Sequence, residues 1–160
     1  MVDSEGFLPN STWQYGADSN LRLARLPATL GPNVTAEGLQ YVYEFSSEVS
    51  QDGFWQDLNA TYMTGATYEF SVGLSRGQNF DYKSIVGLEF RTSDNVPVAS
   101  KSLLAGTLLV EEFGTRSVEL IVPSGASYEG DRVRIGFRFS GTGLSPAIDA
   151  VSVCATPPPM

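Results

Sequence analysis

The sequence predicts an all-β protein, a two-sheet antiparallel β-sandwich with jelly-roll topology. Apolar and polar side chains alternate with a period of two in several segments, which is the spacing of a strand with one buried face. Turn-forming residues recur between these segments, and no window of about a dozen residues carries a helical apolar stripe. The 160 residues, 42% of them hydrophobic and 18% charged, are enough for one domain with its own core.

The alternation is clearest where Val133, Ile135 and Phe137 alternate with arginines and a glycine. Strands are predicted, in chain order, over residues 20–26, 40–45, 54–58, 67–75, 84–91, 96–100, 107–113, 116–122, 132–139 and 147–154. Three consecutive prolines at 157–159 cannot pair in a sheet. The sequence therefore divides into one sandwich domain over residues 1–154 and a Pro-rich tail or linker over residues 155–160.

Composition excludes several classes of function. The formal net charge of −8 repels nucleic-acid phosphates, so no nucleic-acid partner is expected. The absence of histidine removes Ser-His-Asp and Cys-His catalysis and most zinc sites, and the single cysteine, Cys154, excludes an internal disulfide. No apolar run is long enough for membrane insertion, and residues 1–7 lack the basic and apolar regions of a signal peptide.

Three segments carry a resemblance to a known group of domains. They are residues 53–58 (GFWQDL), 65–72 (GATYEFSV) and 147–153 (AIDAVSV). Their order and spacing resemble the carbohydrate-binding-module-like jelly rolls, also called galactose-binding-like domains. Such domains are appended to polysaccharide-degrading enzymes, form ectodomains of bacterial PEP-CTERM surface proteins, and include the calcium-dependent Stig-type indole-alkaloid cyclases. The resemblance implies a jelly-roll fold, a carbohydrate or glycan partner, and an extracellular or surface-associated location.

The resemblance also implies a structural calcium ion. Members of the group usually open with an Asn-x-x-Phe-Glu strand whose acidic residue helps to hold the ion, but here Leu8 follows Phe7 where that glutamate would stand. The implied ligands are Asp3, Glu5 and Asp149, provided that the N-terminal segment lies beside the last strand.

Asp149 has the same parity as Val151 and Val153, so a regular strand would point its carboxylate toward the core. A buried carboxylate needs a cation or strong hydrogen-bond donors. Asp149 is therefore interpreted as a calcium ligand or a partner of backbone amides. A solvated strand-end carboxylate is one alternative, and the general acid that the resemblance to the cyclases would assign is another.

The segment 76–83 is predicted to be a ligand-binding loop. Sugar sites combine amide, carboxylate and guanidinium groups with aromatic side chains. This loop supplies Arg76, Gln78, Asn79, Asp81 and Tyr82. The alternative is a long polar connection whose aromatic side chains cover the edge of the core.

Two tryptophans and a row of arginines complete the candidates. Trp13 and Trp55 could each stack on a ligand, or they could belong to the core. Arg132, Arg134 and Arg138 share the polar face of one predicted strand, where cross-strand pairing with residues such as Glu69 or Glu119 would explain them.

Three functions remain open. The first is a non-catalytic carbohydrate-binding module with a structural calcium. The second is a structural or assembly subunit of a surface layer, filament or virion, which would form a homo-oligomer or a larger assembly. The third is a small calcium-dependent cyclase that uses Asp149 as a general acid; the sequence favours a non-enzyme over this alternative.

Overall fold

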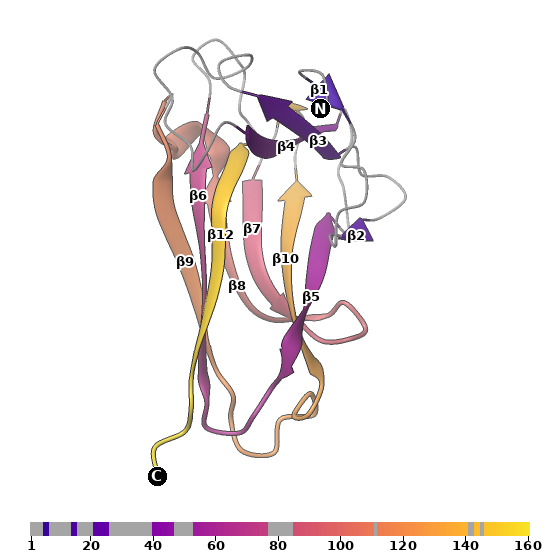
Figure 1. The fold of residues 1–160 in the computed structure, drawn as a ribbon, viewed down its shortest axis with the longest axis vertical. Coiled ribbons are helices and arrows are strands. Elements are labelled where there is room, and N and C mark those ends of the chain that lie inside the picture. The colour runs from indigo at the N-terminus through magenta and orange to yellow at the C-terminus, as the bar shows by residue number, and fades with distance from the viewer. Residues whose placement is uncertain are drawn as a thin grey trace.

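The protein is an all-β sandwich of two antiparallel sheets (Figure 1). The structure is a computed structural model and describes residues 5–6, 14–15, 21–25, 40–46, 53–76, 85–110, 112–140, 143–144 and 146–160. Among them, the predicted all-β fold class is confirmed, and no helix is long and apolar enough to cross a membrane.

The first sheet contains the chain's last strand at its centre. Its order is β1 (Glu5–Gly6), β3 (Leu21–Arg25), β4 (Gln40–Ser46), β12 (Ala147–Thr156), β6 (Thr67–Ser75) and β9 (Gly114–Ile121), and the short β11 (Gly143–Leu144) also pairs with β4. The β4–β12 pairing consists of one residue pair, Val42 with Ile148. The C-terminal part of β12, from Ser152 to Thr156, therefore pairs only with β6 among the described residues.

The second sheet carries the polar surface described below. Its order is β2 (Gln14–Tyr15), β5 (Phe54–Thr61), β10 (Arg132–Ser140), β7 (Ile85–Arg91) and β8 (Pro97–Leu104). A short 3-10 helix, η1 (Ala105–Thr107), leads from β8 back toward β9 in the first sheet.

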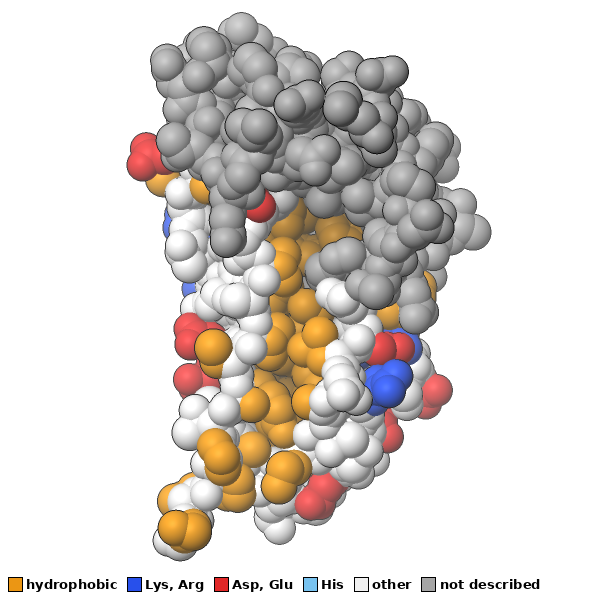
Figure 2. Space-filling view, viewed as in Figure 1, with side chains coloured by type: hydrophobic (Ala, Val, Ile, Leu, Met, Phe, Trp, Pro, Cys, Tyr) orange, Lys and Arg blue, Asp and Glu red, His pale blue; other side chains and the backbone are white. Residues whose placement is uncertain are grey.

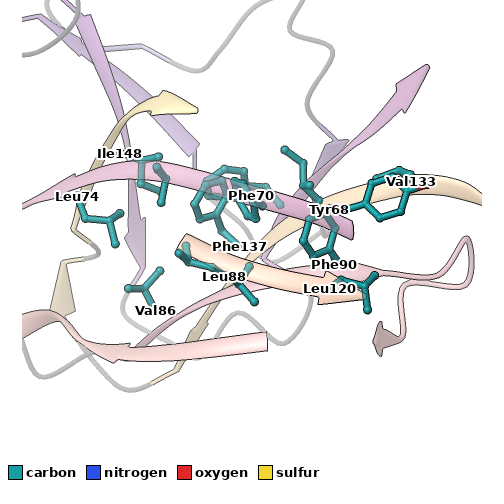
Figure 3. Close-up of a cluster of buried hydrophobic side chains, with 14 of the residues drawn as sticks. Tyr68, Phe70, Leu74, Val86, Leu88, Phe90, Leu120, Val133, Phe137 and Ile148 are labelled. Atoms are coloured by element: carbon teal, nitrogen blue, oxygen red, sulfur yellow. The ribbon is translucent and has the colours of Figure 1, made fainter. Parts of the chain in front are cut away.

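The core fills the space between the sheets. The strands contribute alternate residues to it, as their polarity pattern predicts, and Figure 3 shows these side chains pointing toward one another from β6, β7, β10 and β12. Phe70 on β6 and Phe137 on β10 meet edge to face, with ring centroids 5.3 Å apart, and both are fully buried. This contact joins the two sheets across the middle of the core.

The segment predicted as a strand over residues 107–113 is not one. Its apolar residues are consecutive rather than alternating: Leu108 is buried, whereas Leu109 and Val110 are exposed. It begins in η1, and its described residues form one isolated β-bridge, between Val110 and Arg76. Three other strands continue at least two residues beyond their predicted ends: β5 to residue 61, β8 to residue 104 and β12 to residue 156.

Candidate functional site

The outer face of the second sheet carries polar and aromatic side chains in adjacent rows. One row contains Trp55, Gly136, Glu89 and Ser100, which are directly opposite one another on β5, β10, β7 and β8. Directly opposed residues share a face of the sheet, and their neighbours in sequence, such as Phe54 and Phe137, are buried in the core. Asp57 and Arg134 lie in the row on one side, and Arg138, Gly87 and Ser102 in the row on the other. We call Trp55, Asp57, Glu89, Arg91, Ser100, Ser102, Arg134 and Arg138 the polar platform.

Trp55 is held in place by an ion pair beside it. Arg134 donates from Nε to Asp57 Oδ1 at 2.7 Å and from Nη2 to Asp57 Oδ2 at 3.1 Å, which is a bidentate contact. The same guanidinium lies 5.6 Å from the centroid of the Trp55 ring, within the range of a cation–π contact. Its remaining terminal nitrogen donates to the Ser93 carbonyl in the β7–β8 turn at 3.0 Å. The half-buried indole is therefore bordered by an oriented carboxylate and guanidinium.

A second ion cluster lies beside the first. Glu89 is almost fully buried and accepts from Arg91 Nε at 2.7 Å, while Arg138 Nε approaches its other oxygen at 3.1 Å. Arg91 is fully buried and also donates to Asn95 Oδ1 at 3.0 Å. The three arginines and two carboxylates of the two clusters are fixed by one another, so the platform is a preorganised surface.

The predicted partners of the arginine row are wrong. Glu69 and Glu119 lie on β6 and β9 of the other sheet, directly opposite each other. The partners are instead Asp57, two residues after Trp55, and Glu89, between the buried Leu88 and Phe90. Strand alternation alone places both acids on a polar face, but sheet order, which sets the pairing, is not visible in the sequence.

The predicted ligand-binding residues do not come together in the described part of the chain. Trp55 lies in the polar platform, whereas Arg76 lies at the end of β6 in the other sheet and donates from Nε to the Leu108 carbonyl at 3.0 Å. The other candidates, Trp13, Gln78, Asn79, Asp81 and Tyr82, lie outside the described residues.

Asp149 does not point into the core as a regular strand would require. The register of β12 against β6 shifts between Asp149 and Ser152, and Ala150 has a φ of 49°, in the left-handed region. Ile148 is the buried residue, opposite Leu74, so the half-buried Asp149 lies on the other face, opposite Gly73. This bulge separates Asp149 from the parity of Val153, which packs against the core.

The calcium ligands implied by the resemblance are not assembled in the described residues. Asp3 lies outside them, and only the backbone of Glu5 is described. Two strands, β3 and β4, lie between β1 and β12, so Glu5 and Asp149 are not on neighbouring strands. Among the described side chains, no three His, Cys, Asp or Glu residues form a group that could hold a metal ion.

A second surface is apolar. Figure 2 shows hydrophobic side chains exposed in a long groove between β12 and β5, on the side where the sandwich is open. Leu58 and Val153, from these two strands, are half-buried and pack against the core. Because Asp149 lies on the face of β12 opposite to the buried Ile148, its carboxylate is not part of this groove.

Comparison with known proteins identifies the fold. No protein-family model and no curated protein matches the sequence. The structure is similar to that of a cyclase from Fischerella sp. TAU in complex with 4-(1H-indol-3-yl)butan-2-one, with a TM-score of 0.72, 18% identity, and coverage of 100% of this chain and 92% of that one.

Carbohydrate-binding domains have the same fold. The CBM22-1 xylan-binding domain from Paenibacillus barcinonensis matches with a TM-score of 0.56 and 9% identity, covering 88% of this chain and 83% of that one. A Clostridium thermocellum xylanase with CBM22-1 and GH10 modules, complexed with xylohexaose, matches with a TM-score of 0.52 and 17% identity, over 89% of this chain and 26% of that one. The chain therefore has the carbohydrate-binding-module-like, galactose-binding-like jelly-roll fold that its sequence motifs resemble.

Proposed function

We propose that this protein is a non-catalytic carbohydrate-binding module whose ligand lies on the polar platform. The observation that carries the proposal is the position of Trp55: a half-buried indole beside a bidentate ion pair, in a row with Glu89 and Ser100. A sugar ring offers an apolar C–H face and a rim of hydroxyl groups. The indole suits the face, and fixed carboxylates, guanidiniums and hydroxyls suit the rim.

The glycine of this row supports the same proposal. Gly136 lies between Trp55 and Glu89 on the strand that separates them. The missing side chain leaves room for the Arg91 guanidinium, which occupies the place of a Gly136 side chain, so no side chain projects from the centre of this row.

Affinity electrophoresis in gels containing soluble polysaccharides tests the proposal. Retardation is expected with at least one neutral β-glycan, such as xylan, and it should be lost in Trp55→Ala. Arg132→Gln is the matched control, because Arg132 is exposed on the same strand but lies outside the platform. Equal mobility of the wild-type protein with and without every polysaccharide would contradict the proposal.

Two further parts of the proposal come from the fold resemblance. We propose an extracellular or surface-associated location, where polysaccharides are met, and a stabilising calcium ion held by Asp3, Glu5 and Asp149. Calcium should then raise the melting temperature over that in EGTA, and Asp149→Asn should remove the increase. An identical melting temperature in calcium and in EGTA would exclude the ion.

A cyclase is the second candidate function, and the overlap of the whole chain with the Fischerella cyclase favours it. In this case an apolar, indole-bearing substrate would occupy the groove between β12 and β5. Binding of 4-(1H-indol-3-yl)butan-2-one, followed by the line broadening of methyl resonances from Leu58 and Val153, is the test. Unchanged resonances at saturating ligand would reject it.

A further inference from the structure

The polar platform contains more positive than negative groups, although the protein as a whole carries a net charge of −8. Within the platform, Arg91 and Arg138 pair with Glu89, and Arg134 pairs with Asp57, so three arginines share two carboxylates. One positive charge of the platform is therefore not balanced within it.

The unbalanced charge is located at Arg138. Both oxygens of Asp57 accept hydrogen bonds from Arg134. The shortest ion-pair distance of Glu89, 2.7 Å, is to Nε of the fully buried Arg91. Arg138 reaches Glu89 only through Nε. Its side chain is 34% exposed, against 12% for Arg134 and 0% for Arg91. Arg138 is thus the arginine of the platform that a ligand can reach.

The neighbours of Arg138 leave room for a ligand group. Gly87 is directly opposite on β7, and a Cβ there would lie 3.6 Å from the Arg138 Cβ. On β8 the same row continues with the exposed Ser102, a hydroxyl donor and acceptor. The two terminal nitrogens of Arg138 can direct parallel, coplanar N–H bonds at the two oxygens of a carboxylate.

We propose that the ligand is a glycan bearing uronic acid, whose carboxylate is bound by the terminal nitrogens of Arg138 while a neighbouring sugar stacks on Trp55. This inference rests on the proposed carbohydrate function and adds the class of sugar. One carboxylate per few sugars matches the single unbalanced charge. A densely charged polyanion would extend over the acidic remainder of the protein, whose charges repel it wherever they lie within the Debye length of about 8 Å at physiological salt.

Isothermal titration with two matched oligosaccharides tests the inference. The probes are a linear xylo-oligosaccharide and the same oligosaccharide carrying one glucuronic acid branch. We expect the branched probe to bind about tenfold more tightly at low salt, with the difference shrinking as salt is added. Arg138→Gln should remove this preference, so that the two probes bind with about equal affinity.

Two variants separate recognition from folding. Arg138→Lys keeps the charge without the fork of nitrogens, so part of the preference should remain. Arg132→Gln, at an exposed arginine outside the platform on the same strand, should leave both affinities unchanged. Melting curves identify any variant that has lost its fold.

The outcomes distinguish this inference from the proposed function. Equal affinity of the wild-type protein for the two probes, or an equal loss of both in Arg138→Gln, overturns the uronic acid assignment and leaves carbohydrate binding standing. Tighter binding of a sulfated than of a glucuronic-acid-bearing oligosaccharide also overturns it. Binding of neither probe, with Trp55→Ala indistinguishable from wild type, overturns the proposed function itself.

Discussion

The guanidinium of Arg91 lies directly over Gly136, so close that it occupies the space that a side chain at position 136 would need. A Cβ built on Gly136 would be 2.6 Å from both Cζ and Nε of Arg91. The glycine on β10 is therefore what allows a fully buried arginine to lie flat across the outer face of the sheet and reach Glu89.

Gly136→Ala should destabilise the protein by about 1–3 kcal/mol, because the new methyl group must displace the Arg91 guanidinium from Glu89. Gly87→Ala is the matched control. Its Cβ would meet Glu89 Oε1 at 3.5 Å and the Arg138 Cβ at 3.6 Å, which are ordinary contacts. Urea unfolding of both variants measures the difference, and equal midpoints would show that Arg91 moves away without cost.

Glu89→Gln should cost about 3–5 kcal/mol, since it leaves the fully buried Arg91 without its charged partner. Asp57→Asn should cost less, because the side chains of the Asp57–Arg134 pair are 22% and 12% exposed and water can replace part of the interaction. Thermal unfolding of the two variants tests this order. A larger loss for Asp57→Asn would mean that the second ion cluster is not the stabilising one.

Glu119→Lys should stabilise the protein by up to about 1 kcal/mol. Glu119 and Glu69 are exposed and directly opposite each other on β9 and β6, so the wild-type protein places like charges across a strand pair. The substitution turns this repulsion into an attraction, and the gain should shrink in 1 M salt, where the Debye length is about 3 Å. A gain that is equal at low and high salt would have another origin than charge.

The stability of the protein should fall above about pH 10, where an exposed tyrosine ionises. Burial raises the pKa of Tyr62 above its ordinary value; the hydroxyl donates to the Arg91 carbonyl at 3.0 Å. Below pH 10 the phenol is neutral in both states and its contribution is constant. Above it the unfolded chain loses the proton while the folded protein keeps it, so unfolding becomes easier.

Tyr62→Phe should lower the free energy of unfolding at pH 7 and weaken its decrease between about pH 10 and 11. Burial also raises the pKa of Tyr128, so part of the decrease should remain, and Tyr128→Phe is the control. Urea unfolding across this range is the measurement. An alkaline decrease as steep in Tyr62→Phe as in wild type would show that Tyr62 ionises normally in the fold.

The sequence predicted the strands better than the surface they build. Alternation predicted both ends of the strand at 67–75 correctly, because every second residue of β6 faces the same continuous core. It failed at Asp149, where one bulge reverses the parity of the strand, and at residues 107–113, where the apolar residues follow one another without alternating.

The polar platform could not be predicted from the sequence, because its residues come together only through the order of the strands. Trp55, Glu89 and Ser100 come from strands that are far apart in sequence, and only the order β5, β10, β7, β8 makes them neighbours. Parity indicates that each of them is on a polar face, but it does not indicate which face it shares with which strand.

Fluorescence of Trp55 during titration with a polysaccharide tests carbohydrate binding on the platform most directly. The chain has two tryptophans, so Trp13→Phe leaves Trp55 as the sole reporter, and Trp55→Phe serves as the converse variant. Stacking of a sugar should shift the Trp55 emission to shorter wavelength, saturably and at the affinity found by electrophoresis. Saturable binding in Trp55→Phe at wild-type affinity, with no change of Trp55 emission in Trp13→Phe, would place the ligand elsewhere and contradict the account.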